Sequence, residues 1–136
     1  CNQFVGDALW RAGVRMPSYK LPGGGEHYVN AEALPHQRAY FDRLARVADL
    51  RVGDVIVIDF PGRGQDGAHT EIVTHRDTST VRATGAHADG AYETEVSPLL
   101  GESWSSALSR ARRDGEAGCW RLGAHTIYLL RPRRRR

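Results

Sequence analysis

Apolar residues near the start of the chain recur every three or four positions. This spacing sets them along one side of a helix, which predicts a helix over residues 2–12 with a buried stripe. Gly13 follows directly, and glycine is a residue type that commonly ends a helix. The stripe is formed by Phe4, Val5, Ala8, Leu9 and Ala12.

A second helical pattern spans residues 35–48. Its apolar positions share one face, and Pro35 suits a first helical position because the N–H that it lacks would be unpaired there. The preceding segment, residues 14–34, contains two prolines and the glycine run GGG, so we expect an irregular surface connection there. The face of the second helix is formed by Tyr40, Phe41, Leu44, Ala45 and Ala48.

From residue 52 onward the pattern changes to that of strands. VGDVIVIDF (52–60) is a compact apolar run rich in β-branched residues, which predicts a central strand. Further strands are predicted in HTEIVTH (69–75), TVRATGAH (80–87), GAYETEV (90–96) and HTIYLLRP (125–132), with a late helix over 104–111. Helices followed by a run of strands are typical of an α+β protein, here with N-terminal helices packed on a mostly antiparallel β-sheet.

Composition and charge are those of an ordinary soluble domain. Of 136 residues, 40% are hydrophobic and 26% are charged, and no apolar run approaches the ~20 residues needed to span a bilayer. The net charge is +3, but five of the nineteen basic residues lie in the final RPRRRR, and without them the balance is 14 − 16, or −2. We therefore divide the chain into a domain over 1–130 and a basic tail over 131–136, and we do not expect nucleic acid as a partner.

The first residue is a cysteine at the head of the predicted helix. Unpaired N–H groups and the helix dipole favour negative charge there, which lowers the pKa of a thiol and favours the nucleophilic thiolate. Because Cys1 stands where a translation product would have Met, we expect sequence upstream of it. The other cysteine, Cys119, precedes Trp120 and is interpreted as a packing residue, since a bridge between the two cysteines would abolish the nucleophile.

A cysteine nucleophile needs a base that accepts its proton and a third group that orients the base. Of the six histidines, His69 is the best candidate because it begins a predicted strand directly after a glycine-rich loop. His75 shares its face of the strand but lies about 20 Å further along at ~3.3 Å per residue, so the two cannot serve one site. A metal site built on Cys119 and His125 lacks a recognised ligand spacing, and we expect neither metal nor cofactor.

Three segments in order, CNQFVGDAL, LRVGDVIVIDF and GAHTEIVTH, resemble the papain-like cysteine hydrolases of the NlpC and CHAP type. The resemblance covers roughly residues 1–90 and implies a papain-like fold, a nucleophile at Cys1 and a base at His69. It also implies that a His, Asn, Asp or Glu on the strand after the histidine orients the base.

Hairpin geometry helps to choose this third residue. A three-residue turn over 77–79 pairs Arg76 with Thr80 and brings His87 opposite His69, whereas an even-numbered turn brings Ala86 there instead. Asp77-Thr78 is a poor two-residue turn, because that geometry favours Gly or Asn at positive φ. We therefore favour His87, followed by Asp89 and then by Glu71.

These observations predict a cysteine hydrolase that cleaves an amide bond through a thiol acyl-enzyme. The resemblance implies bacterial cell-wall peptide as substrate, cleaved by an endopeptidase or amidase. We expect the protein to be secreted or delivered into a target cell or the periplasm. One alternative is a secreted toxin or effector domain, with self-processing an open question, that acts on a target protein as a protease or glutamine deamidase. A second alternative is a non-catalytic module whose RPRRRR tail binds nucleic acid or an acidic surface.

Overall fold

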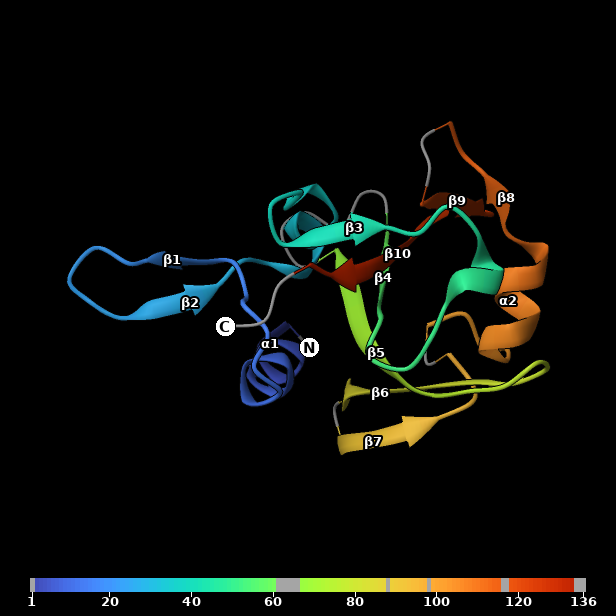
Figure 1. The fold of residues 1–136 in the computed structure, drawn as a ribbon, viewed down its shortest axis with the longest axis horizontal. Coiled ribbons are helices and arrows are strands. Elements are labelled where there is room, and N and C mark those ends of the chain that lie inside the picture. Colours follow the sequence, from blue (N-terminus) through green and yellow to red (C-terminus); the bar gives the residue numbers. More distant parts are fainter. Residues whose placement is uncertain (1, 61–66, 88, 98, 116–117, 134–136) are drawn as a thin grey trace.

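The computed structural model describes residues 2–60, 67–87, 89–97, 99–115 and 118–133 (Figure 1). One antiparallel sheet dominates it, with strands in the order β7-β6-β5-β4-β10-β9-β8 and with β3 paired to the far end of β10. Its strands are β3 (Phe41–Arg43), β4 (Val55–Asp59), β5 (Ala68–Arg76), β6 (Val81–His87), β7 (Gly90–Thr94), β8 (Arg112–Arg113), β9 (Cys119–Leu122) and β10 (His125–Pro132).

The remaining elements are short. They are the helices α1 (Asn2–Arg11) and α2 (Trp104–Arg110), the 3₁₀ helices η1 (Ala31–His36) and η2 (Val47–Asp49), and the hairpin strands β1 (Ser18–Lys20) and β2 (Glu26–Tyr28). Within the described ranges, no helix has both the length and the apolar composition required to cross a bilayer.

The predicted fold class, a papain-like α+β protein with N-terminal helices packed on a sheet, is wrong. A large antiparallel sheet forms most of the molecule, and the predicted second helix over residues 35–48 is replaced by η1, β3 and η2. Phe41, which belonged to the expected helical face, instead pairs with Pro132 at the end of β10 and is 1% exposed. Tertiary strand pairing has overridden the local helical pattern.

The segment over residues 14–34 is more regular than predicted. Strands β1 and β2 form a small separate hairpin, in which Ser18 pairs with Tyr28 and Lys20 with Glu26. The three glycines of GGG turn the chain between them, and Gly24 has a φ of 103°, a backbone conformation that side chains oppose. The glycine run therefore forms a hairpin turn rather than part of an irregular connection.

Other predicted elements are confirmed. The first helix begins at Asn2, VIVID forms the central strand β4, and β10 covers residues 125–132 as predicted. Strands β8 and β9 were not predicted, because each is too short to show an alternating pattern. The division between residues 130 and 131 falls inside β10, where Arg131 makes two hydrogen bonds to the buried carboxylate of Asp54.

The sheet separates two apolar cores, because alternate residues of a strand face opposite sides. Val55 and Val57 of β4 face the core that contains α1, whereas Ile56 and Ile58 face the core that contains α2. Figure 1 shows α1 and α2 on opposite sides of the molecule. His69 pairs with Ile58 across β4 and β5, so its side chain belongs to the α2 face.

Candidate functional site

The register between β5 and β6 decides which side chains meet at the candidate site. Arg76 pairs with Val81, so the turn holds four residues and the predicted pairing of Arg76 with Thr80 is wrong. A β-bulge between Val73 and His75 then shifts the register by one residue, so that Val73 pairs with Ala83. In this register His87 lies opposite His69, as predicted, but the register results from a bulge and not from an odd-numbered turn.

Asp77 explains why the turn adopts four residues without a glycine. Its carboxylate accepts hydrogen bonds from the backbone N–H groups of Ser79 (2.9 Å) and Thr80 (2.7 Å) and lies 3.1 Å from His75 Nε2. These interactions, with the Ser79 backbone bond contributing most, lower the pKa of Asp77 to about 2. The side chain thus supplies the turn contacts that the sequence pattern alone did not indicate.

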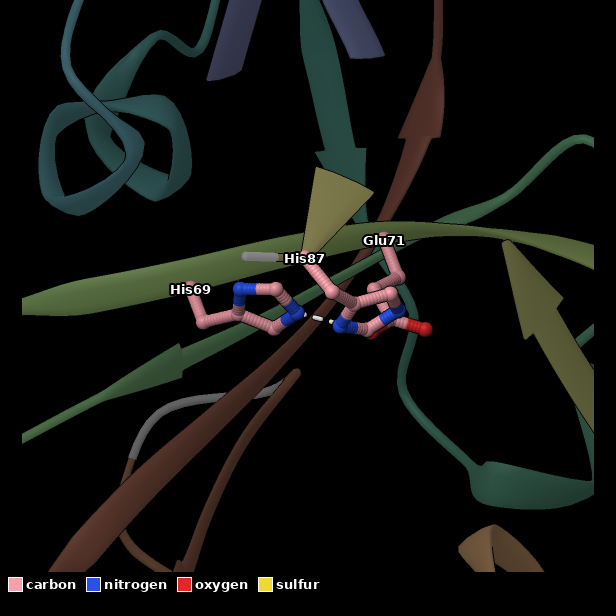
Figure 2. Close-up of side chains that lie close together, drawn as sticks. All are labelled: His69, Glu71 and His87. Carbon is pink, nitrogen blue, oxygen red and sulfur yellow. Dashed lines mark hydrogen bonds and ion pairs between the residues drawn. The ribbon is translucent and has the colours of Figure 1, made fainter. Parts of the chain in front are cut away.

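Three side chains from β5 and β6 converge on the α2 face of the sheet. Figure 2 shows that His69, Glu71 and His87 point toward one another. His69 Nε2 is 2.7 Å from Glu71 Oε2, and His87 Nε2 is 3.6 Å from the same oxygen. The side chains are 13%, 0% and 8% exposed, respectively, so the carboxylate is fully buried between two nearly buried imidazoles.

With Glu71 ionised, the short contact assigns a role to each nitrogen of His69. An ionised carboxylate can only accept hydrogen bonds, so His69 Nε2 donates its proton to Glu71. In the neutral ring, the lone pair then resides on Nδ1, which is the nitrogen able to accept a proton. Glu71, ranked last among the candidates for the orienting residue, is therefore the group that hydrogen bonds to His69.

Gly85 makes room for this carboxylate. A Cβ atom at position 85 would lie 2.5 Å from Glu71 Cγ and 2.9 Å from its Cδ, which is much closer than ordinary contact. The β6 backbone can therefore approach Glu71 only because residue 85 has no side chain. The spacing of His69 and Glu71 two residues apart on one strand, with a glycine on the next, was the sequence signal for this arrangement.

The first two candidates for the third residue have different surroundings. The ring of His87 packs against that of Tyr92 with centroids 4.4 Å apart, and it lies 5.7 Å from the ring of His69. Asp89 is exposed and interacts with Tyr92. Loss of hydration raises the pKa of Tyr92, and the Asp89 carboxylate and the charge of Glu71 act in the same direction. Asp89 thus interacts with Tyr92, whose ring packs against that of His87.

Two buried polar atoms of the cluster make no hydrogen bond to any residue that the structure describes. They are Oε1 of Glu71 and Nε2 of His87. One ligand atom from each of His69, Glu71 and His87 can be chosen so that all three lie within 4.8 Å of one another. The cluster therefore combines two imidazoles, a buried carboxyl group and two polar atoms that make no hydrogen bond to the described residues.

The proposed nucleophile, Cys1, lies outside the described residues, so its approach to His69 stays a prediction. Helix α1, which follows it, packs through Val5 and Leu9 on the face of the sheet opposite to His69. The other cysteine, Cys119, is buried in β9, in agreement with a packing role.

Comparison with family models, curated proteins and solved structures finds no match. The resemblance to NlpC and CHAP enzymes therefore depends on the three quoted segments alone.

Proposed function

We propose that this protein is a cysteine hydrolase that cleaves an amide bond, with bacterial cell-wall peptide as its substrate class. Cys1 is the nucleophile and His69 is the general base. Glu71 replaces His87 as the residue that orients the base. His87 is a neighbour of this pair and not its orienting group.

The hydrogen bond from His69 to the buried carboxylate of Glu71 carries the proposal. It holds the imidazole in the tautomer with a free lone pair on Nδ1, and it stabilises the imidazolium that forms when the ring takes up a proton. Because Glu71 is fully buried, water does not compete for this hydrogen bond. His87 is less suited to the role, since its Nε2 makes no hydrogen bond to any described residue.

The reaction proceeds through a thioester. His69 Nδ1 accepts the thiol proton of Cys1, and the thiolate sulfur forms a bond to the carbonyl carbon of the substrate. The carbon–nitrogen bond then breaks, and the imidazolium of His69 gives its proton to the leaving amine. Water, deprotonated by His69, hydrolyses the thioester, so that the products are a carboxylic acid and an amine with free Cys1.

The assignment of Cys1 rests on its place in the sequence, directly before the first residue of α1, and on the resemblance. Because α1 and His69 lie on opposite faces of the sheet, the pairing of sulfur and imidazole is the step most in need of a test. Alkylation by iodoacetamide, followed by peptide mass analysis, measures the reactivity of Cys1 directly. We expect His69→Gln to slow alkylation of Cys1 and to leave that of Cys119 unchanged, since Cys119 is buried elsewhere in the sheet.

Activity is tested by amine release from purified peptidoglycan. We expect Cys1→Ala to abolish it and His69→Gln to reduce it by about 10²–10⁴-fold, the usual contribution of a general base. Two matched controls retain activity: Cys119→Ala, and His75→Gln, which alters an exposed histidine on the same strand. Full activity of Cys1→Ala would refute the proposed nucleophile, and full activity of folded His69→Gln would refute the proposed base.

A further inference from the structure

The His69–Glu71–His87 cluster contains more polar groups than a general base requires. One carboxylate oxygen, Oε2, lies 2.7 Å from His69 Nε2 and 3.6 Å from His87 Nε2. The second imidazole makes no hydrogen bond to any described residue, and neither does the second carboxylate oxygen. Orientation of His69 explains the first contact only.

Burial makes these groups energetically unfavourable unless they are paired. The Glu71 side chain is 0% exposed and that of His87 is 8% exposed, so water reaches neither of them well. A buried polar atom without a hydrogen bond is destabilising, and a buried charge more so. A cation between the two imidazoles and the carboxylate would provide a partner for His87 Nε2 and would balance the charge of the ionised carboxylate.

The donor types select among the common cations. Ca²⁺ and Mg²⁺ prefer oxygen ligands, whereas two imidazoles and one carboxylate are a ligand set typical of Zn²⁺. At Zn–N and Zn–O distances of about 2.0–2.1 Å, ligand atoms at tetrahedral positions are about 3.3 Å apart. The separations of 2.7 and 3.6 Å from Glu71 Oε2 lie on either side of that value, and all three ligand atoms lie within 4.8 Å of one another, so side-chain rotations that bring the two imidazole nitrogens closer together would complete the geometry.

We propose that His69, Glu71 and His87 bind one Zn²⁺ ion, with the fourth coordination position left open. The inference goes beyond the proposed function and does not need Cys1. The ring of Tyr92 from β7 packs against His87 of β6, and the absence of a side chain at Gly85 leaves room for Glu71 of β5. The site offers a thiol-free coordination sphere of two nitrogen atoms and one oxygen.

Zinc binding and the proposed base compete for the same ring. With Zn²⁺ on Nε2, a neutral His69 ring carries its proton on Nδ1, and the lone pair that accepts a proton is lost. Bound zinc therefore inhibits the proposed hydrolysis, and a chelator reverses the inhibition.

The binding test uses the full chain without an affinity tag, first freed of metal by a chelator and then titrated with Zn²⁺ by calorimetry. We expect one equivalent to bind. His87→Gln and Glu71→Gln each remove a ligand, and they should weaken binding by more than the ~10–100-fold that follows from loss of an outer-shell partner. The matched control is His75→Gln, because His75 and Asp77 repeat the same two-residue spacing on the same strand in an exposed position.

Glu71→Gln alters a fully buried group, so a second measurement uses the unaltered protein. X-ray absorption at the zinc edge should show two imidazole ligands and further light-atom ligands at about 2.0–2.1 Å, without sulfur. Equal affinity of folded His87→Gln and the wild type would overturn the proposal, and so would a sulfur ligand or loss of binding in His75→Gln alone.

The fate of the two proposals can be told apart. Zinc binding that is lost in His87→Gln but kept in Cys1→Ala supports the metal site whether or not amide hydrolysis is found. If zinc binds at this site and Cys1-dependent hydrolysis continues undiminished, the metal site stands and the role of His69 as base is refuted. If zinc does not bind and hydrolysis requires both Cys1 and His69, the metal site is refuted and the role of His69 as base is supported.

Discussion

Replacement of Gly85 by alanine tests whether the close approach of β6 to Glu71 is a feature of the fold. The new Cβ would lie 2.5 Å from Glu71 Cγ and 3.1 Å from its Oε2, about 0.9 Å short of ordinary contact at the nearest atom. Inserting a methyl group into a packed site costs about 1–3 kcal/mol. Replacing glycine by alanine also lowers the conformational entropy of the unfolded chain, which stabilises the folded protein by about 0.4–1 kcal/mol.

The expected net result for Gly85→Ala is a loss of about 1–2 kcal/mol in the free energy of unfolding. Urea unfolding followed by circular dichroism measures it, and with a slope near 2 kcal/mol per molar the midpoint should fall by roughly 0.5–1 M. The decisive control is the same substitution in a Glu71→Ala background, where nothing remains to clash. There Gly85→Ala should stabilise by about 0.4–1 kcal/mol. Equal destabilisation in both backgrounds would show that Glu71 is not the obstacle.

Three further predictions concern other parts of the fold. Arg131→Met leaves the 1% exposed Asp54 without its two guanidinium hydrogen bonds and should lower the free energy of unfolding by about 3 kcal/mol. The control is Arg46→Met: Arg46 forms an exposed ion pair with Asp49, so its loss should change the free energy of unfolding little. The native pKa of Asp77, about 2, lies below its unfolded value of ~3.9, so its stabilisation is present above that value and lost as the pH falls toward 2. The urea midpoints of the wild type and Asp77→Asn should therefore differ at pH 6 and converge near pH 2; a constant difference would contradict this origin. Gly24→Ala, at a φ of 103°, should loosen the β1–β2 hairpin by ~1 kcal/mol and speed hydrogen exchange of its paired amides about fivefold, while the amides of β4 keep their rates.

Sequence patterns predicted the elements whose residues bury one regular face. Strand β4 is an unbroken β-branched run, and α1 carries a stripe that includes Val5 and Leu9, so local pattern and final burial agree. The prediction of a second helix was wrong because Phe41 pairs with Pro132 at the end of β10 instead of forming a helical turn. The two residues are far apart in the sequence, so a local pattern does not reveal the pairing. A wrong second helix led to the wrong fold class.

The sequence predicted which residues belong to the candidate site, but not which of them contact one another. Parity of an expected three-residue turn predicted His87 opposite His69. The actual turn has four residues, with backbone N–H groups bonded to Asp77, and the same register is reached through a bulge between Val73 and His75. Glu71 was ranked last because the orienting residue was sought on the next strand. Its importance depends on depth of burial, a property of the folded sheet that alternation along HTEIVTH does not reveal.

The row of side chains along β5 shows why the buried carboxylate calls for a functional explanation. His69, Glu71 and Val73 follow one another on one face, and exposure falls from 13% at the imidazole side chain to 0% at the valine, where the α2 core begins. A well-packed apolar residue in place of Glu71 would extend this core and is often at least as stable as a buried charge pair. Glu71 instead requires a glycine on β6 and leaves one of its oxygens without a hydrogen bond to the described residues. We therefore infer that Glu71 orients an imidazole or binds a cation. Hydrolytic activity and zinc affinity of Glu71→Gln separate the two roles. An amide oxygen can still accept the hydrogen bond of His69, so a base would keep part of its activity, whereas a zinc site would lose its only anionic ligand.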